Sequence, residues 1–438
     1  MIPLLVGAEG LLLGTAWLAR LGPLGVHRWE FLVSYGVVCL AYVVALRSIT
    51  ARTAGGSLGP RGALLLVGGV ALLARILAFS LPESDDVYRY LWEGRLQNHG
   101  GNPYTVSPIE ARTAFPEVAA GDPYLPRVNH PELTTIYPPL AELVFRGVTS
   151  IDYRIAAWKL AMLFLELALF LLLERLLRSR GRSPVALLAY AWHPLPVLGF
   201  AGEGHMDVLA LVTSWLAIVA TLGGARLLGG LGWGSAVASK LVPGVYLPAF
   251  ASRLGWKGFL AAALVLVLPA LPYAEAGWGL LRVAFRFGRE MAHNSAASVL
   301  LGWLVGEERA PVVALALFTV LWGASWIWFR RDQGALGGER DRLIPGTLHL
   351  TGAFLVLAPT LHPWYLTWLV PYFVFLRPGG WLALSLTGGL GYLAYGYGAE
   401  TGVFHLPPGV LGWEFGIPLG IVLLSAGSRF LPGKLRHS

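Results

Sequence analysis

Hydrophobic side chains occur in long blocks along this chain, separated by short polar segments. Most blocks are close to ~20 residues, the length that crosses about 30 Å of hydrocarbon. The first block has no basic region before it and no cleavage site after it, so we expect a first span and not a removed signal. The pattern predicts an all-α polytopic membrane protein with spans near 3–20, 31–47, 62–80, 153–174, 184–200, 205–222, 227–250, 258–274, 311–329, 346–360, 364–377, 380–397 and 412–427.

Composition agrees with this pattern. The 438 residues are 55% hydrophobic and only 13% charged, whereas soluble domains are about 25% charged. The single cysteine, Cys39, excludes a disulfide framework and a cysteine metal site. The net charge of +8 is carried by short basic clusters between spans, as orientation in a bilayer requires, so we expect no nucleic-acid partner.

The basic clusters predict the orientation of the spans. Placing them all on the cytoplasmic side puts both termini inside and gives twelve crossings. The 227–250 block then has basic residues at both ends, so we expect it to enter and return, with a break near Lys240 and Pro243. The clusters are Arg47, Arg52 and Arg61; Arg175, Arg178, Arg180 and Arg182; Arg330, Arg331, Arg340 and Arg342; and Arg429, Lys434 and Arg436.

One long segment differs from the rest of the chain. Residues 81–138 contain eight acidic residues and four arginines, and the predicted orientation places them outside the membrane. Long loops of this kind are usually functional. Within it we expect a helix over 85–97, capped by Ser84. The chain therefore divides into N-terminal membrane helices (1–80), an extracytoplasmic catalytic loop with short helices (81–138) and a transmembrane bundle (139–438) that includes an outer loop at 275–295.

An acidic pair at the start of this loop is the first candidate for chemistry. Asp85 and Asp86 directly follow the third predicted span. Neighbouring carboxylates raise each other's pKa, and partial dehydration raises it further. Such a carboxylate can act as a general base on a hydroxyl. The alternative is a solvated first turn of a helix, with acids that complement its dipole.

Three further polar sets lie at the predicted outer ends of spans. Glu203, His205 and Asp207 follow one another within five residues and would bind a sugar or a hard cation such as Mg²⁺, or else form a polar hairpin. His362 precedes a proline at a span end, where it orients a carboxylate or only caps a helix. The cationic set suits a phosphate or lipid headgroups and comprises Arg286, Arg289, His293 and Lys240.

Several short motifs carry a resemblance to a known family. They are S-D-D-V-Y-R-Y-L-W-E-G-R at 84–95, G-G-N-P-Y at 100–104, I-Y-P-P-L at 136–140, G-H-M-D-V-L-A at 204–210, S-K-L-V-P at 239–243, F-R-F-G-R-E with H-N at 285–294, and H-P-W-Y at 362–365. In this order they resemble the polyprenyl-phosphate-sugar-dependent glycosyltransferases of the GT-C superfamily. The likeness is to the bacterial mannosyltransferase-like branch and covers about 80–410.

The resemblance implies a bundle of about 12–14 transmembrane helices with a long first extracytoplasmic loop that bears the catalytic aspartate. It implies transfer of a sugar, in first place mannose, from a polyprenyl-phosphate donor with inversion and without a metal or other cofactor. The acceptor would be a hydroxyl of a lipid-linked or glycan molecule outside the bacterial plasma membrane. The base would be Asp86 or Asp85, with Asp86 favoured, and His362 would face it.

Other residues are expected to contact the substrates. The donor phosphate would lie on Arg286, Arg289, His293 and Lys240. The remaining substrate-binding candidates are Tyr88, Arg89, Arg95, Tyr104, Tyr137, Glu203, His205, Asp207 and Asn294. Two alternatives stay open: a related enzyme that uses glucose, arabinose or galactose or another acceptor, and a secondary transporter with its site at Lys240.

Overall fold

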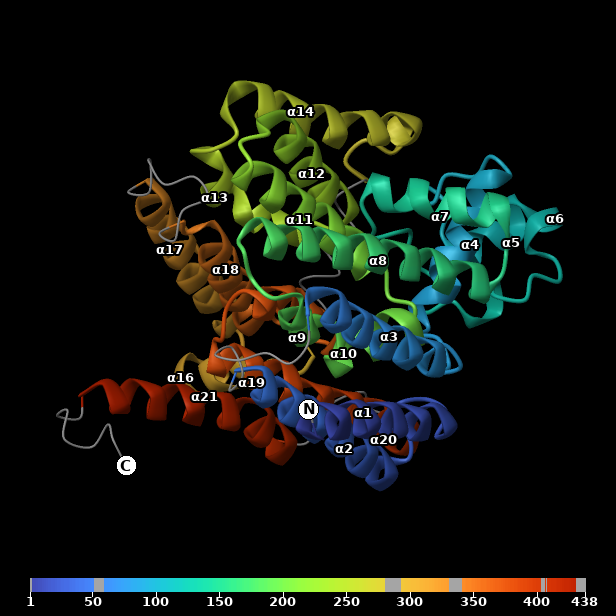
Figure 1. The fold of residues 1–438 in the computed structure, drawn as a ribbon. Helices are drawn as coiled ribbons and strands as arrows, with labels where there is room; N and C mark the ends of the chain where they lie inside the picture. The colour runs from blue at the N-terminus through green and yellow to red at the C-terminus, as the bar shows by residue number, and fades with distance from the viewer. Residues whose placement is uncertain are drawn as a thin grey trace.

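The computed structural model describes residues 2–50, 59–279, 293–330, 341–402, 406 and 408–430. These residues are helical or irregular, and their one β-contact is an isolated bridge between His293 and Thr360. Figure 1 shows the helices packed side by side in a bundle. The all-α polytopic fold is therefore confirmed. Arg286 and Arg289 lie outside the described residues.

Five of the described helices are long and apolar enough to cross a membrane. They are α1 (Ile2–Arg20), α2 (Arg28–Thr50), α3 (Pro60–Ala78), α14 (Gly255–Val267) with η5 (Leu268–Ala276), and α17 (Ala310–Arg330). The number becomes six if the bent pair at 184–202 is one span. A total of 12–14 helices stays a prediction.

The remaining helices complete the bundle. They are α8 (Ile155–Ser179), η2 (Pro184–Leu187), α9 (Leu188–Ala191), α10 (Pro194–Pro196), the π-helix η3 (Val197–Gly202), α11 (Asp207–Leu222), α12 (Arg226–Ser239), η4 (Val242–Tyr246), α13 (Leu247–Ala251), α16 (Ala296–Val305), α18 (Leu343–Leu357), η6 (Pro363–Val374), α19 (Gly379–Thr387), η7 (Gly388–Tyr392), α20 (Leu393–Thr401) and α21 (Pro408–Phe430).

Breaks in the helices lie close to the candidate residues. Helix α12 ends at Ser239, Lys240 is extended, and η4 begins at Val242, so the predicted break near Lys240 is confirmed. The segment predicted as a span at 184–200 is apolar enough to cross a membrane as a pair of helices, but the chain bends by 62° within it. Pro194 follows the bend, and a proline cannot continue the hydrogen-bond pattern of the helix before it.

The spans predicted at 364–377 and 380–397 also lack continuous α-helix. The first is the 3₁₀-helix η6, which carries Pro371 in its interior, and the second is divided into α19, η7 and α20. Irregular backbone of this kind is tolerated at membrane depth where protein buries it. Residues 366–374 are buried throughout.

The polar segment 81–138 forms an ordered unit at one end of the molecule. It contains α4 (Asp86–Asn98), α5 (Pro108–Ala114), α6 (Pro116–Ala119) and η1 (Leu125–Arg127), and it leads into α7 (Pro139–Ile151). These helices lie together at the right of Figure 1. Tyr88, Trp92 and Leu96 of α4 bury their side chains in a small core of this unit, which is completed by Ala111, Val118, Leu125 and Val128.

The helix expected over 85–97 is confirmed as α4, with one correction at its start. Asp85, not Ser84, occupies the N-cap position. Ser84 still contributes, because its hydroxyl accepts a hydrogen bond from the Asp86 backbone N–H at 3.4 Å. The helix therefore begins at Asp86 and holds this side chain in its first turn.

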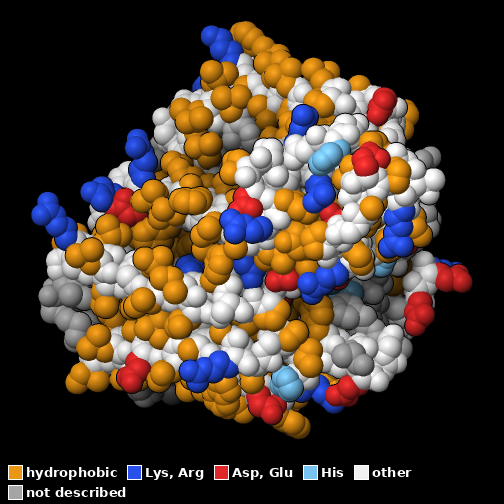
Figure 2. Space-filling model, turned by 90° about the vertical axis from the view of Figure 1, so that its right-hand side faces the viewer, with side chains coloured by type: hydrophobic (Ala, Val, Ile, Leu, Met, Phe, Trp, Pro, Cys, Tyr) orange, Lys and Arg blue, Asp and Glu red, His pale blue; other side chains and the backbone are white. Residues whose placement is uncertain are grey.

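Helices α4 and α7 cross at very short range. A Cβ atom on Gly94 would lie 2.4 Å from the carbonyl oxygen of Phe145 on α7, so only glycine fits at this contact. Figure 2 views this end of the molecule and shows acidic, basic and histidine side chains among hydrophobic ones.

Candidate active site

Asp86 lies at the junction of the 81–138 unit with the helix bundle. One carboxylate oxygen accepts a hydrogen bond from the Asn129 side chain at 3.1 Å, and the other accepts one from the Tyr90 hydroxyl at 3.4 Å. The Asp86 side chain is 24% exposed. Its neighbour Asp85 is exposed at the helix start. Asp86 is thus held in place but still reachable.

The segment from Glu203 to Asp207 packs against the start of α4, on the bundle side of Asp86. The backbone N–H of Ser84 donates to the Glu203 carbonyl at 3.0 Å, which ties this segment to the start of α4. Gly204 makes the turn at φ +77°, a backbone angle that other residues rarely adopt. The turn brings the His205 ring to Asp86, with Nδ1 3.8 Å from the carboxylate.

His205 contacts a second carboxylate with its other nitrogen. Nε2 lies 3.4 Å from Oε2 of Glu203. The same Glu203 oxygen accepts a hydrogen bond from the Tyr392 hydroxyl at 2.5 Å. His205 is completely buried, and the Trp364 indole stacks on its ring at 3.9 Å between centroids. These contacts form a polar chain from Asp86 through His205 and Glu203 to Tyr392.

The other two histidines expected at the site continue the ring stack. Trp364 also stacks on His362 at 4.4 Å, and His362 stacks on His293 at 5.0 Å. The resemblance placed His362 against the catalytic aspartate; in the structure His205 lies there, with Nδ1 3.8 Å from the Asp86 carboxylate. Asn294 lies beside His293 and donates to the Leu361 carbonyl and to Glu414, both at 3.1 Å.

Lys240 provides a cation at the break between α12 and η4. Its Nζ donates to Oδ1 of Asp207 at 2.5 Å and lies 4.5 Å above the Tyr365 ring. Asp207 is buried and also accepts from the Trp368 indole at 2.7 Å. The Lys240 side chain is 22% exposed. An ammonium has three donors, so Lys240 can bind an anion while it keeps its pair with Asp207.

The electrostatic setting suits a base at Asp86. Burial raises the pKa of Asp86, and the adjacent Asp85 charge raises it further, whereas His205, Asn129 and Lys240 act in the opposite direction. The net direction is upward. A carboxylate with a raised pKa takes a proton from a hydroxyl more readily than an ordinary one.

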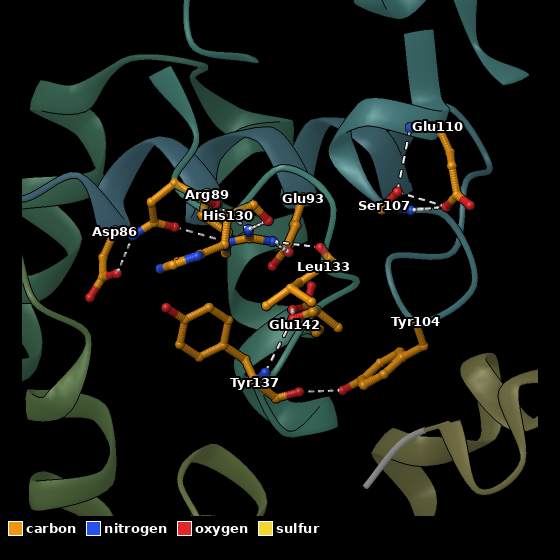
Figure 3. A network of polar contacts seen from close by, with 12 residues as sticks. Asp86, Arg89, Glu93, Tyr104, Ser107, Glu110, His130, Leu133, Tyr137 and Glu142 are labelled. Carbon is orange, nitrogen blue, oxygen red and sulfur yellow. Dashed lines mark hydrogen bonds and ion pairs between the residues drawn. The ribbon is translucent and has the colours of Figure 1, made fainter. Parts of the chain in front are cut away.

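Arg89 and Glu93 form a second polar cluster one and two turns further along α4 (Figure 3). Arg89 pairs with Glu93 at 3.0 Å and donates to the carbonyls of His130 and Leu133 at 2.8 and 3.2 Å. It also donates to both the side chain and the backbone carbonyl of Asn129. All five guanidinium donors are therefore used within the protein, and Arg89 positions Asn129, which in turn holds Asp86.

Glu142 on α7 completes this second cluster. It accepts hydrogen bonds from Thr135 at 2.6 Å and from Gln97 at 2.7 Å, and Gln97 is bound by the Tyr273 hydroxyl at 2.7 Å. Burial and the nearby Glu93 raise the pKa of Glu142 well above its usual range. The cluster lies in the interior of the 81–138 unit and joins it to α7 and η5.

The remaining candidates of the 81–138 unit occupy separate places. Tyr88 donates to Glu83 at 2.5 Å, with Arg127 over its ring. Arg95 is 3.4 Å from the Asp122 carboxylate and covers the Tyr153 ring. The Tyr104 hydroxyl donates to the Tyr137 carbonyl at 2.6 Å.

These positions divide the candidates into near and distant ones. The Tyr137 ring packs against Tyr90, the residue that donates to Asp86, with 5.2 Å between the ring centroids. Tyr137 is therefore close to Asp86, whereas Tyr88, Arg95 and Tyr104 bind Glu83, Asp122 and the Tyr137 carbonyl.

The structure also has an apolar cavity of about 570 Å³. Leu241, which follows Lys240, lines one side, and Ile136 and Pro138, which flank Tyr137, line another. The rest of its wall comes from Pro139, Val237, Ala238, Leu266, Ala270, Gly277 and Trp278. The lining is hydrophobic, which suits the hydrocarbon part of an amphiphile, and Lys240 directly precedes Leu241 of this lining in the chain.

Sequence reasoning missed several contributors. Tyr90 is four residues after Asp86 on the same helix, and this spacing alone places both on one face. Asn129, Tyr392 and Trp364 approach from distant parts of the chain, and no local pattern marks them. Among the described residues, no group of three or more His, Cys, Asp or Glu side chains is arranged to hold a metal ion.

Comparison with known proteins gives one match. A family model described as the N-terminal domain of alpha-(1→6)-mannopyranosyltransferase matches residues 12–255, more than half of the chain. The matched region includes Asp86, the Glu203–Asp207 segment and Lys240. No curated protein and no solved structure shows significant similarity to the chain.

Proposed function

Because the chain belongs to the alpha-(1→6)-mannopyranosyltransferase family, a family of glycosyltransferases, we propose that it moves mannose from a polyprenyl-phosphate donor to an acceptor hydroxyl. The acceptor is a lipid-linked molecule or a glycan. The 81–138 unit bears the catalytic base Asp86, and 139–438 supplies the donor site. Reaction takes place on the extracytoplasmic side of the bacterial plasma membrane, where the predicted orientation puts the 81–138 unit.

The observation that carries this proposal is the apolar cavity whose wall includes Leu241, the residue that follows Lys240. A nucleotide sugar is polar throughout, whereas a polyprenyl phosphate joins a hydrocarbon chain to a single anion. The cavity wall that includes Leu241 and Ile136 fits the chain, and the adjacent Lys240 fits the phosphate. His293 would assist from the ring stack, and Arg286 and Arg289 belong to the same expected set.

Asp86 is the proposed general base. It removes the proton from the acceptor hydroxyl as the oxygen attacks the anomeric carbon of mannose. The bond from that carbon to the phosphate oxygen breaks, and the polyprenyl phosphate leaves with the bonding electrons, stabilised by Lys240. Holding both substrates in line in one site lowers the barrier further.

The arrangement favours one displacement with inversion of configuration. A two-step retaining reaction needs a second carboxylate about 5–5.5 Å from the first, on the other face of the sugar. The buried carboxylate of Glu203 is separated from Asp86 by the His205 imidazole, which contacts both. Asp85 precedes Asp86 at the start of α4 and is directed to solvent.

The test is a comparison of donors with the purified protein in lipid nanodiscs. The acceptor is an octyl α-mannoside, and the donors are radiolabelled polyprenyl-phosphate mannose, mannose 1-phosphate and a guanosine-diphosphate mannose. We expect product from the polyprenyl donor alone, with equal yield in the presence of EDTA. Transfer from the nucleotide sugar, or no transfer from any donor by folded protein, would overturn the proposal.

A further inference from the structure

We propose that His205 and Glu203 form a proton relay behind Asp86, which carries the acceptor's proton away from the reacting oxygen. The inference rests on the proposed function of Asp86 as the base. It gives His205 and Glu203 a role in proton transfer in place of the substrate contacts expected from the sequence.

The geometry orders the three side chains in a line. His205 directs Nδ1 to Asp86 at 3.8 Å and Nε2 to Glu203 at 3.4 Å. Both distances exceed a normal hydrogen bond, but catalytic contacts are often long without substrate and shorten when it binds. The two ring nitrogens therefore face the two carboxylates that a relay requires.

The His205 ring has few other orientations available to it. The Trp364 indole covers one face at 3.9 Å. The Gly204 carbonyl is held by the Trp158 indole N–H at 2.7 Å, which fixes the backbone directly before the ring. The side chain is wholly buried, so water has no direct access to its nitrogens. A buried imidazole that contacts two carboxylates is better explained by proton transfer than by sugar binding, which needs exposure.

Glu203 is held in position at the end of the relay. Its Oε2 accepts a 2.5 Å hydrogen bond from Tyr392, and its side chain is only 9% exposed. The same oxygen lies 3.4 Å from Nε2 of His205, so it faces the nitrogen that would give up a proton.

The relay begins when the acceptor hydroxyl gives its proton to Asp86 while the oxygen bonds to the anomeric carbon. Asp86 passes this proton to Nδ1 of His205, and the proton already on Nε2 moves to Glu203. Asp86 and His205 return to an anionic carboxylate and a neutral imidazole, and Glu203 ends as a carboxylic acid. No oxidant or further reactant is needed.

Charged groups on the surrounding elements also interact with Asp86, His205 and Glu203. Those facing Asp86 are Asp85 and Arg89 on α4 and Lys240 at the end of α12. Those facing His205 and Glu203 are His362 before η6 and Lys159 on α8. All of these residues are kept in the variants below, so a change in pH dependence reports on Asp86, His205 and Glu203 themselves.

The test compares His205→Asn, Glu203→Gln and the double variant with wild type. We expect the kcat of each single variant to fall roughly 100-fold, the low end of general acid–base effects, with the donor KM within about twofold. The double variant should lose no more than either single one, because members of one relay act as a unit. Glu203→Gln keeps the Tyr392 hydrogen bond and so protects the fold.

The pH profile separates a relay from a structural role. The interaction with His205 lowers the pKa of Asp86, so His205→Asn should move the acid limb of kcat to higher pH. His193→Asn is the control, because His193 is equally buried but binds Ser385 away from the site. Unchanged kcat in both single variants, or losses that multiply in the double variant, would overturn the relay. Inactive wild type would instead overturn the proposed function.

Discussion

Helix α4 carries two groups of charged side chains that differ in their exposure to solvent. The side chains of Arg89 and Glu93 are 5% and 2% exposed, and Arg89 has all five donors in use. Asp86, one turn earlier, is 24% exposed, and its contacts with His205 and Tyr90 are 3.8 and 3.4 Å. Buried networks such as that of Arg89 and Glu93, here called the closed cluster, stabilise a fold. A partly exposed carboxylate with a raised pKa, such as Asp86 in what we call the open site, is typical of a reactive group.

The position of Asp86 depends on the cluster of Arg89 and Glu93. Arg89 binds the backbone of the segment that includes Asn129, and Asn129 donates to Asp86. The closed cluster therefore holds Asn129 in place, and Asn129 in turn positions Asp86 of the open site. Damage to the first should appear as lost stability, and damage to the second as lost turnover.

The largest expected effect on stability comes from Arg89→Met. It leaves Glu93 as a buried unpaired charge and frees the Asn129 segment, which should cost about 3–5 kcal/mol. The midpoint of thermal unfolding in detergent measures this loss. Arg112→Met is the control, because Arg112 is exposed on the neighbouring α5. Equal midpoints for the two variants would mean that the closed cluster is not a support.

Lys240→Gln tests the cationic side of the open site. The amide can still donate to Asp207, but the charge that would bind the donor phosphate is gone. Charge-assisted hydrogen bonds contribute about 1.5–3 kcal/mol, so kcat/KM for the polyprenyl donor should fall by roughly 10- to 100-fold. Lys257→Gln removes an exposed charge elsewhere and should change nothing. A full-rate Lys240→Gln enzyme would remove Lys240 from the site.

Gly94→Ala tests the crossing on which both clusters depend. The added methyl would lie 2.4 Å from the Phe145 carbonyl oxygen, and overpacking of this kind costs about 1–3 kcal/mol. Gly147→Ala on α7 meets no atom within 4 Å and should leave stability equal or slightly higher. The midpoints of thermal unfolding of the two variants measure this difference in stability. An unchanged midpoint for Gly94→Ala would show that the crossing of α4 and α7 has room for a methyl group.

Asp85→Asn should have the smallest effect at neutral pH. The Asp85 charge raises the pKa of Asp86, so its removal lowers that pKa. The base then loses its activity at a lower pH than in wild type, and the acid limb of the pH–rate profile should move downward. Glu117→Gln on α6 is the control, since Glu117 is exposed outside the site. Loss of all activity in Asp85→Asn would make Asp85 the base.

Local sequence was sufficient for the features that depend on chain neighbours. The apolar blocks predicted the helical membrane fold, the charges flanking 227–250 predicted the break at Lys240, and the acidic pair marked the start of α4. Each of these follows from side chains within a few residues of one another, where periodicity and capping act.

Contacts between distant segments could not be predicted in the same way. The approach of His205 to Asp86 depends on the turn at Gly204 and on the hydrogen bond from Ser84 to Glu203. His362 has the same residue type and a similar predicted depth, and the sequence contains nothing that ranks one histidine over the other. The bend at 184–202 was missed because a hydrophobic block reads as continuous even where proline divides it.

The most direct test of the central claim compares Asp86→Asn with Glu142→Gln, one acid from each cluster. Polyprenyl-phosphate mannose is the donor, and thermal unfolding is measured on the same samples. We expect Asp86→Asn to keep its unfolding midpoint and to lose about 10²- to 10⁴-fold in kcat, while Glu142→Gln, which resembles the protonated acid, retains turnover. An active Asp86→Asn enzyme, or an inactive but stably folded Glu142→Gln enzyme, would contradict the assignment of the base.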